Sequence, residues 1–380
     1  MPLNHFVDKE LSDWMQQQGP DADVVISSRI RLARNIADLP FSPLMTDRAT
    51  EDILKQLEQV METDAFKELG DYELLKLKDM TTLDRKILVE KHLISPRLSK
   101  DYLQSAVIIK EDESVNVMVN EEDHLRIQSI TSGFRLQEAY QSANKVDDAI
   151  ENIVDFAFDE RLGYLTSCLT NVGTGLRASV MVHIPALVMT GQAKRLLSAI
   201  QRVGLAVRGY YGEGSEAVGN IYQISNQLTL GYSEQEIIEN LEDVIRQVIE
   251  HERYARKQLM ENSKLNLEDT IYRSLGILLY ARMISSQEVM QRISDVRLGI
   301  DLGMLKGLSS NILKELMVVT SVGFLQKYAG KELEAQERDI MRAKVIRERL
   351  VNIQFNKEDQ QQKEDQQHKH NNQDDNVDNI

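Results

Sequence analysis

Residues 120–126 read NEEDHLR and directly follow an alternating apolar stretch, 114–119, that predicts a β-strand. A strand end is a rigid platform that can hold the side chains just beyond it in place for chemistry. Glu121, Glu122 and the aspartate after them would repel one another unless a cation lies opposite, and Arg126 lies close by. An acidic run is more often a solvated loop, so the segment needs support from the rest of the chain.

Four further arginines stand in unusual settings: Arg29, Arg31, Arg177 and Arg208. Arg29 and Arg31 follow an apolar start at residue 24 that predicts a strand, and residues two apart on a strand point to the same face. Two cations on one face are costly without an anion between them, and the planar guanidinium fits phosphate oxygens. With a carboxylate pair nearby, these arginines indicate a site that binds a polyphosphate and places a base on the attacking group. The alternative is that they lie scattered on exposed surfaces.

The composition is that of a globular protein and excludes several classes. The chain has 380 residues, 42% hydrophobic and 28% charged, which is enough for a sizeable core and two domains. A net charge of -15 argues against a general nucleic-acid binder. Cys168 is the only cysteine, so we expect no intrachain disulfide and no cysteine-based zinc site, which suits a reducing cytoplasm. Neither a signal peptide nor a membrane span is visible.

Periodicity predicts a mixed first part and a helical second part. Helices are expected over 47–61, 83–92, 136–160 and 191–202, and strands over 105–110, 114–119, 125–130, 178–184 and 220–227, after a lead-in over 1–23. Capping boxes at Ser233 with Glu236 and at Ser285 with Glu288 open two further helices, the second where strand signals have stopped. The expected domains are 1–261 and a helical domain over 262–352, followed by a polar tail over 353–380 that we expect to be disordered.

Three further segments carry residues suited to binding. Cys168 precedes glycines at 173 and 175 that would let backbone amides approach a ligand, and nearby guanidinium groups would favour a thiolate, although a buried inert cysteine is commoner. Residues 208–216 form a glycine-rich loop, either a flap over a site or a hairpin tip. Arg338 and Arg342 lie four apart on one face of an expected helix, where they would bind a phosphorylated ligand or form a solvated salt-bridge ladder.

Four motifs in this order resemble the catalytic domain of the guanidino kinases, the family of creatine and arginine kinases: SSRIRLARN over 27–35, NEEDHLR, CLTNVGTGLRASV over 168–180 and RGYYGEGSEAVGNIYQISN over 208–226. Within that family the chain resembles the bacterial protein-arginine kinases most, and RDIMRA over 338–343 extends the resemblance beyond residues 20–255. The resemblance implies an α+β fold whose central antiparallel sheet is flanked by helices and binds ATP with Mg²⁺. An all-helical C-terminal domain would follow and support dimerisation.

The resemblance also implies roles for individual residues. Glu122 would be the catalytic carboxylate, Glu213 a second carboxylate on the acceptor guanidinium, and Cys168 the active-site thiol. The implied nucleotide contacts are Ser27, Ser28, Arg29, Ile30, Arg31, His92, Arg126, Arg177, Ala178, Ser179, Val180, Met181, Arg208, Gly209, Tyr210, Tyr211, Gly212 and Glu213. An implied allosteric phosphoarginine pocket contains Arg338, Asp339, Ile340, Met341, Arg342 and Ala343. No residue is assigned as a direct metal ligand.

The implied activity is transfer of the γ-phosphoryl group of ATP to arginine side chains of proteins, in bacterial stress protein quality control. Only about twenty residues precede the first arginine motif, so we expect no N-terminal domain that covers a small guanidino substrate. The resemblance further implies a homodimer in the cytoplasm, with a zinc-binding activator protein, a heat-shock repressor and a Clp ATPase–protease as partners, and neither membrane nor direct nucleic-acid contact. Two alternatives remain: a kinase for free arginine or a similar phosphagen, and a catalytically silent phosphoarginine-binding adaptor.

Overall fold

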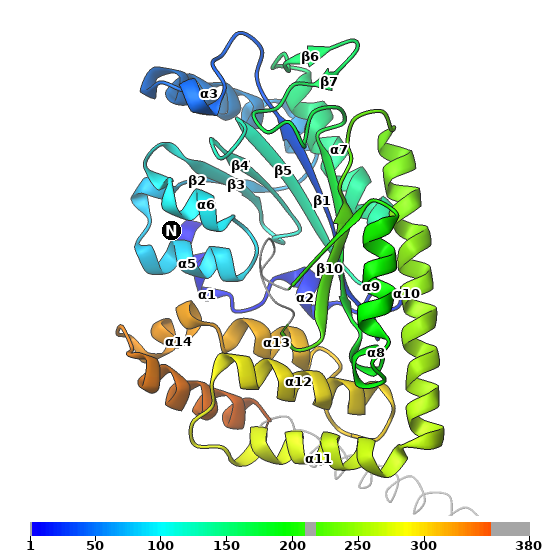
Figure 1. Cartoon of the computed structure of the whole chain (residues 1–380). Coiled ribbons are helices and arrows are strands. Elements are labelled where there is room, and N and C mark those ends of the chain that lie inside the picture. The colour runs from blue at the N-terminus through cyan, green and yellow to red at the C-terminus, as the bar shows by residue number, and fades with distance from the viewer. Residues whose placement is uncertain (1, 210–217, 351–380) are drawn as a thin grey trace, which may run out of the picture.

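The computed structural model describes residues 2–209 and 218–350, and these form an eight-stranded antiparallel sheet flanked by helices (Figure 1). The strands run in the order β2-β3-β4-β5-β1-β8-β10-β9. Their bounds are β1 Val25–Arg34, β2 Tyr72–Lys76, β3 Ala106–Lys110, β4 Val115–Val119, β5 Leu125–Ser132, β8 Leu176–His183, β9 Leu205–Gly209 and β10 Ile221–Asn226. A separate ribbon pairs β6 Phe158–Asp159 with β7 Gly163–Tyr164. The expected α+β class with a central antiparallel sheet is confirmed.

The helices of the first part are α1 Pro2–Asp8, α2 Asp13–Gln16, α3 Asp47–Glu62, α4 Asp64–Lys67, α5 Thr82–Glu90, α6 Pro96–Lys100, α7 Leu136–Glu151, α8 Pro185–Met189, α9 Ala193–Arg202 and α10 Glu234–Asn262, with 3-10 turns over Ser42–Leu44, Leu77–Asp79 and Tyr102–Gln104. The helices expected in the first part are all present, and α1, α2, α4, α6 and α8 are short helices that were not expected. The capping box at Ser233 is present. The helix expected over 136–160 ends at Glu151, because the backbone over 155–157 bonds instead to Asn35 and Ala37 beyond β1.

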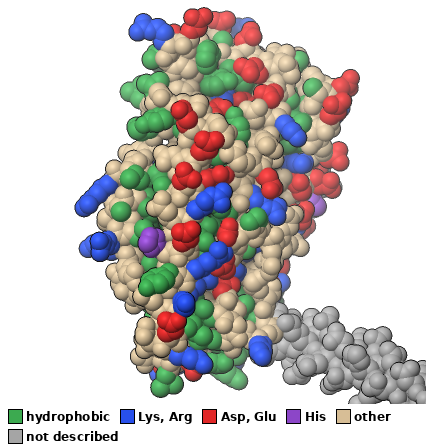
Figure 2. Space-filling view, turned by 90° about the vertical axis from the view of Figure 1, so that its right-hand side faces the viewer, with side chains coloured by type: hydrophobic (Ala, Val, Ile, Leu, Met, Phe, Trp, Pro, Cys, Tyr) green, Lys and Arg blue, Asp and Glu red, His purple; other side chains and the backbone are tan. Residues whose placement is uncertain are grey.

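The two faces of the sheet differ because apolar and polar residues alternate along its central strands. Ile30 and Val180 point into the main hydrophobic core, where α7 and α10 pack against the sheet. Cross-strand register pairs Arg31 with Arg177 and Ala33 with Arg126, so the arginines share the opposite face. The outer surface seen in Figure 2 carries acidic and basic side chains interspersed over the molecule. The concentrated arginines of the sheet are therefore a local feature of an acidic chain.

The lead-in over 1–23 contains two helices that its sequence did not predict. Lys91 holds this segment, since its Nζ donates to the backbone oxygens of Phe6 at 2.8 Å and Lys9 at 2.9 Å. The same Nζ lies 2.6 Å from Glu113 Oε1, and both ionised groups are fully buried. Ser12 also donates to the Glu113 carboxylate. A buried ion pair thus ties the N-terminal segment to the end of α5 and to the turn between β3 and β4.

The C-terminal part consists of helices and connecting loops as far as it is described. Its helices are α11 Lys264–Tyr280, α12 Ser286–Asp301, α13 Ile312–Val319, α14 Val322–Ala329 and one over 335–350. Ser285 accepts from the backbone N of Glu288, which is one of the two bonds of the expected capping box. Residues 351–352 and the tail over 353–380 lie outside the described residues. No described helix is long and apolar enough to cross a membrane.

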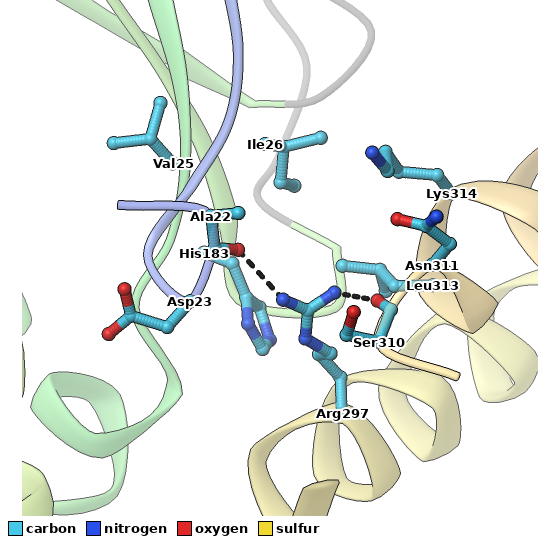
Figure 3. Close-up of a pocket in the computed structure, with 10 residues that line it drawn as sticks. All are labelled: Ala22, Asp23, Val25, Ile26, His183, Arg297, Ser310, Asn311, Leu313 and Lys314. Carbon is cyan, nitrogen blue, oxygen red and sulfur yellow. Dashed lines mark hydrogen bonds between the residues drawn. The ribbon is translucent and has the colours of Figure 1, made fainter. Parts of the chain in front are cut away.

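The C-terminal helices meet the sheet at a polar junction, which Figure 3 shows. Arg297 of α12 donates to the backbone oxygen of Ala22 at 2.7 Å. Lys314 of α13 donates to the backbone oxygen of Gln17 at 2.7 Å and to Ser132 Oγ at 3.0 Å. Buried cations need such partners to offset lost hydration. The two helices are therefore held in one position against the start of β1 and the end of β5.

Candidate active site

Five arginines from four strands lie on the polar face of the sheet. Arg29 and Arg31 belong to β1, and Arg126, Arg177 and Arg208 belong to β5, β8 and β9. Burial and the positive charges of Arg29, Arg126 and Arg177 lower the pKa of Arg31 well below its usual value. A cluster of cations is unfavourable by itself, so the geometry favours a polyanion between the guanidinium groups.

Two adjoining pockets meet at these arginines. The first, which we call the Cys168 pocket, has a volume of about 470 Å³ and contains Glu122 and Cys168. The second, the His92 pocket, has a volume of about 490 Å³ and contains His92 together with several apolar side chains. Both pockets are lined by Arg31, Arg126 and Arg208. These volumes suit small ligands. Phosphates at the shared arginines would leave a nucleoside in one pocket and an acceptor in the other.

The two glutamates of NEEDHLR have different surroundings. Glu121 is buried, its Oε2 lies 2.6 Å from Arg126 Nη1, and its Oε1 accepts from Ser95 Oγ at 2.5 Å. Glu122 is more exposed and lies 3.6 Å from both Arg126 Nη2 and Arg97 Nη1. Glu122 also lines the Cys168 pocket. The first glutamate thus orients an arginine, whereas the second keeps capacity to bind a ligand.

The second half of NEEDHLR joins three segments of the chain. Asp123 Oδ1 accepts from Asn35 Nδ2 at 2.7 Å and from the backbone N of Ser167 at 2.6 Å. Asn35 Oδ1 in turn accepts from the backbone N of His124 at 2.8 Å, and His124 Nδ1 accepts from the backbone N of Ile36 at 2.9 Å. The acidic run is therefore neither a solvated loop nor wholly catalytic, since Asp123 positions the loop that leads into Cys168.

The loop around Cys168 is packed tightly against neighbouring backbone. Cys168 is partly exposed, and its Sγ lies 3.0 Å from Thr170 Oγ1. Gly173 has φ +115°, and a Cβ there would lie 2.3 Å from the Thr229 oxygen. Gly175 has φ +63°, and a Cβ there would lie 2.6 Å from the Ala33 oxygen. Close contact between chain segments requires both glycines. Gly175 also lines the Cys168 pocket, and the expectation that these glycines let a ligand approach stays a prediction.

The His92 pocket contains the expected histidine in an unusual state. Burial, followed by the charges of Arg29 and Arg31, lowers the pKa of His92 to about 3. Its backbone has φ +62°, and its backbone oxygen accepts from Gln128 Nε2 at 2.8 Å. Arg29 Nη2 donates to Gln223 Oε1 at 2.8 Å on β10. The imidazole is therefore neutral at physiological pH, which suits contact with an uncharged base.

The expected nucleotide stretches are not used as a whole. Ser179 and Met181 lie on the arginine face with Ser27, and Met181 lines the His92 pocket. Ile30, Ala178 and Val180 belong to the hydrophobic core, and Ser28 Oγ is buried in a bond to the Gly133 oxygen. The alternation of the strand explains the split. These four side chains point away from the arginines, and their expected nucleotide contacts stay a prediction.

The remaining expected residues fall in two places. Gly209 ends β9 beside Arg208. Tyr210, Tyr211, Gly212 and Glu213 lie outside the described residues, and so does the tip of the glycine-rich loop.

The RDIMRA segment does not form an exposed arginine pair. Arg342 is buried and donates to the backbone oxygens of Thr320 and Ile284, each at 3.0 Å, and it pairs with Asp339. Arg338 is more exposed and donates to the Leu333 oxygen at 2.7 Å. The flanking residues differ in the same way, since Ile340 is exposed, Met341 is half-buried and Ala343 is buried. Arg338 and Arg342 lie four apart on one helix as expected, but Arg342 is buried and holds the turn after α13, and the phosphoarginine pocket stays a prediction.

Sequence reasoning missed several residues that shape the site. Glu90, Met317 and Ser321 line the His92 pocket, and the last two come from the C-terminal helices. Asn35 is the last residue of the SSRIRLARN motif and had no expected role, although it bonds both Asp123 and His124. Asn35 directly follows β1, whose last residues are buried. A polar residue in such a position is the signal that could have indicated it. No local pattern indicates Met317.

An antiparallel sheet with a row of arginines shared by a carboxylate–thiol pocket and a pocket that contains a neutral histidine defines a phosphotransferase site of the guanidino-kinase class. The family model for the ATP:guanido phosphotransferase C-terminal catalytic domain matches residues 52–255. The model for the protein-arginine kinase McsB C-terminal domain matches residues 264–365. The chain belongs to the protein-arginine kinase family of ATP:guanido phosphotransferases, which confirms the resemblance inferred from its motifs.

Proteins called protein-arginine kinase are similar over most of the chain. That of Bacillus subtilis (strain 168) is 55% identical over 350 residues, which cover 92% of this chain and 96% of the relative. That of Bacillus pumilus (strain SAFR-032) is 54% identical over the same length, with 92% and 96% covered. A solved lombricine kinase has a TM-score of 0.54 at 24% identity, covering 68% of this chain and 76% of its own. This last likeness concerns the fold alone.

Proposed function

We propose that this chain transfers the γ-phosphoryl group of ATP to the guanidinium of arginine side chains in proteins. The observation that carries the proposal is the set of three arginines shared by the Cys168 pocket and the His92 pocket. It supports a phosphate chain that bridges a nucleoside and an acceptor. The names of the relatives support a protein arginine as that acceptor.

In the proposed reaction, a nitrogen of the acceptor guanidinium attacks the γ-phosphorus, the N–P bond forms, and the bond to the bridging oxygen of ADP breaks. A guanidinium with a pKa above about 12 is a poor nucleophile until it is aligned and loses a proton. We assign that proton to Glu122, which lines the Cys168 pocket. Glu213 and Cys168 would hold the other guanidinium nitrogens. The arginines would stabilise charge on the transferring group, since positioning and electrostatics supply most of the rate in phosphoryl transfer.

Mg²⁺ fits this site as a companion of the nucleotide. The described residues contain no group of three or more His, Cys, Asp or Glu that could hold a metal. Mg²⁺ commonly binds through substrate phosphates and keeps several waters. We therefore propose that the ion enters with ATP, where it would neutralise phosphate charge. Glu121 and Glu122 lie beside Arg126, where phosphates would bind, so they would accept hydrogen bonds from the waters of the ion.

The remaining expectations of the family resemblance are part of the proposal. They are a cytoplasmic homodimer, a role in stress protein quality control, control by phosphoarginine at the RDIMRA segment, and partners of three kinds: a zinc-binding activator, a heat-shock repressor and a Clp ATPase–protease. The partly exposed Arg338 supports the phosphoarginine contact. Arg342 would contribute indirectly to that contact, by holding the turn after α13 in place.

The test is mass spectrometry, under non-acidic conditions, of an arginine-rich protein incubated with the chain and MgATP. The Glu122→Gln variant and an exposed-carboxylate control, Glu111→Gln, are run beside the wild type. We expect phosphate on arginine with the wild type and the control, and a loss of at least about 100-fold with Glu122→Gln. Free arginine is added as competitor.

Two results would contradict the proposal. Phosphate on free arginine alone would make the chain a phosphagen kinase. A Glu122→Gln protein that keeps every effect on its partners, with no transfer by the wild type even though ATP binds, would make it an adaptor.

A further inference from the structure

One wall of the His92 pocket comes from the C-terminal helices. Met317 of α13 and Ser321, two residues beyond the end of α13, line this pocket together with the sheet residue Met181. Met317 is half-buried, so part of its side chain is open to the cavity. The pocket that would hold the nucleoside is therefore completed by a part of the chain far from the catalytic motifs.

The helix that carries Met317 is fixed at both ends. Met317 lies three residues after Lys314, on the same face of α13, and Ser321 follows just after the end of that helix. At one end, Lys314 donates to Ser132 Oγ and to the Gln17 oxygen. At the other end, Ser321 Oγ donates to Glu90 Oε2 at 2.7 Å. Met317 lies between these two contacts.

The Glu90 carboxylate binds the N-terminal end of α14 through hydrogen bonds. Its Oε1 and Oε2 accept from the backbone N of Gly323 at 2.8 and 3.0 Å, which satisfies a helix N-terminal donor. A Cβ at position 323 would lie 2.6 Å from Glu90 Oε2, so a side chain there would displace the carboxylate from its present position. Glu90 is two residues before His92 at the end of α5. The same carboxylate therefore borders the pocket and locks the helices that complete it.

The lining of the His92 pocket contains groups suited to phosphates and groups suited to a base. Three of its arginines are shared with the Cys168 pocket. The other side chains include Val89, Ile94 and Met118 with the neutral His92. A planar heteroaromatic base is favoured among such groups, because thioethers and aliphatic side chains make good contacts with aromatic rings.

We propose that Met317 is a nucleotide-binding residue that packs against the base of ATP, and that Glu90 is a positioning residue that holds Met317 there. The inference rests on the proposed function, since it takes the shared arginines as the phosphate site. The C-terminal helices then contribute directly to substrate affinity. A nucleotide would contact both parts of the chain at once.

The test compares two ligands that share phosphates but differ in the base. Calorimetry of the full-length protein with MgATP and with magnesium tripolyphosphate is done for wild type, Met317→Ala and Met304→Ala. Met304 is a half-buried methionine of the same part of the chain that lies outside the pocket. We expect Met317→Ala to raise the Kd for ATP about 5- to 20-fold and to change that for tripolyphosphate less than about twofold. Met304→Ala should change neither.

The Glu90→Gln variant tests the positioning role. Its amide nitrogen cannot accept a hydrogen bond, so one of the contacts to Ser321 and Gly323 is lost. We expect a rise of about 3- to 10-fold in the Kd for ATP and little change for tripolyphosphate. In the double variant with Met317→Ala the two losses should not multiply, because both act through one side chain.

The outcomes separate this inference from the proposed function. Unchanged ATP affinity in Met317→Ala, or an equal loss for both ligands, would overturn the base contact alone. Losses that multiply in the double variant would remove the positioning role of Glu90. A wild-type protein that binds neither ATP nor tripolyphosphate would overturn the proposed function and this inference with it.

Discussion

The Asp123 carboxylate accepts a hydrogen bond from the backbone N of Ser167 at 2.6 Å. This contact links the residue after Glu122 to the residue before Cys168. The two groups that line one wall of the Cys168 pocket are therefore held in a common frame by a side chain that does not itself line the pocket.

Replacing Asp123 with alanine should slow turnover while leaving nucleotide binding intact. The loop before Cys168 loses its anchor, and a misplacement of about 1 Å near reacting groups can cost about 100-fold in rate. We expect kcat to fall about 10- to 100-fold with less than about a threefold change in the Kd for ATP. Asp123→Asn should restore most of the rate, because a single oxygen, Oδ1, accepts both bonds.

A matched control is Asp159→Ala, because Asp159 Oδ1 also accepts from two backbone N–H groups, in the turn between β6 and β7. Its turnover should equal that of the wild type. An Asp123→Asn protein as slow as Asp123→Ala would contradict the anchoring role.

Breaking the buried pair between Lys91 and Glu113 should destabilise the fold. Lys91→Met leaves a fully buried carboxylate without its cation, which costs about 3–5 kcal/mol. Adding Glu113→Gln should recover part of that loss, since the uncompensated charge is removed. Urea unfolding measures both. Lys67→Met removes the exposed pair with Glu62 and should cost at most about 1 kcal/mol. Equal losses in the single and double variants would argue against a charge effect.

The neutral His92 should make stability fall as the solution becomes acidic. Its folded pKa is about 3, whereas an unperturbed histidine titrates near pH 6.5. Between these values the unfolded chain binds a proton that the folded chain does not, so the free energy of unfolding decreases as pH falls. The slope for one histidine is at most about 1.4 kcal/mol per pH unit.

His92→Asn should therefore lose less stability than wild type between pH 7 and pH 5. Asparagine is chosen because it tolerates the positive φ of this position. Urea unfolding at several pH values measures the difference. Replacing the exposed His251 with glutamine serves as control and should keep the wild-type slope. Parallel curves for wild type and His92→Asn would contradict the burial of a neutral imidazole.

The two arginines of RDIMRA should behave differently when each is replaced by alanine. Arg342→Ala leaves the buried oxygens of Thr320 and Ile284 without a donor, so we expect a loss of about 2–4 kcal/mol in unfolding free energy. Arg338→Ala should weaken phosphoarginine binding and leave stability within about 1 kcal/mol of wild type.

Calorimetry with phosphoarginine and urea unfolding together separate these effects. Arg273→Ala, at an exposed arginine of α11, is the control for both measurements. Unchanged phosphoarginine affinity in Arg338→Ala would remove the pocket assignment, and unchanged stability in Arg342→Ala would contradict its structural role.

The central strands of the sheet and the arginines that they carry could be predicted because their signals are local, whereas the edge strands β2 and β9 were not expected. Alternation along 114–119 and the spacing of Arg29 and Arg31 depend only on neighbouring residues, and the capping box at Ser233 has the same character. The end of α7 at Glu151 could not be predicted in this way, because the segment over 155–157 forms its backbone bonds with residues near position 36.

The hydrogen bonds between Glu90 and the start of α14 were even less predictable from local sequence. Its partner Gly323 is 233 residues away, and neither residue belongs to a motif. Helical spacing placed Arg338 and Arg342 on one face correctly in principle, but spacing does not tell which neighbouring helix covers that face. Arg342 is buried for this reason.

The position of Cys168 in the lining of the Cys168 pocket has a practical consequence. The chain has a single sulfhydryl, and that group is partly open to the pocket where the acceptor would lie. A thiol-reactive fluorophore would therefore label the native polypeptide at one site, with no need to remove other cysteines. Protection from labelling by an arginine peptide, and its absence with tripolyphosphate alone, would report acceptor occupancy in real time.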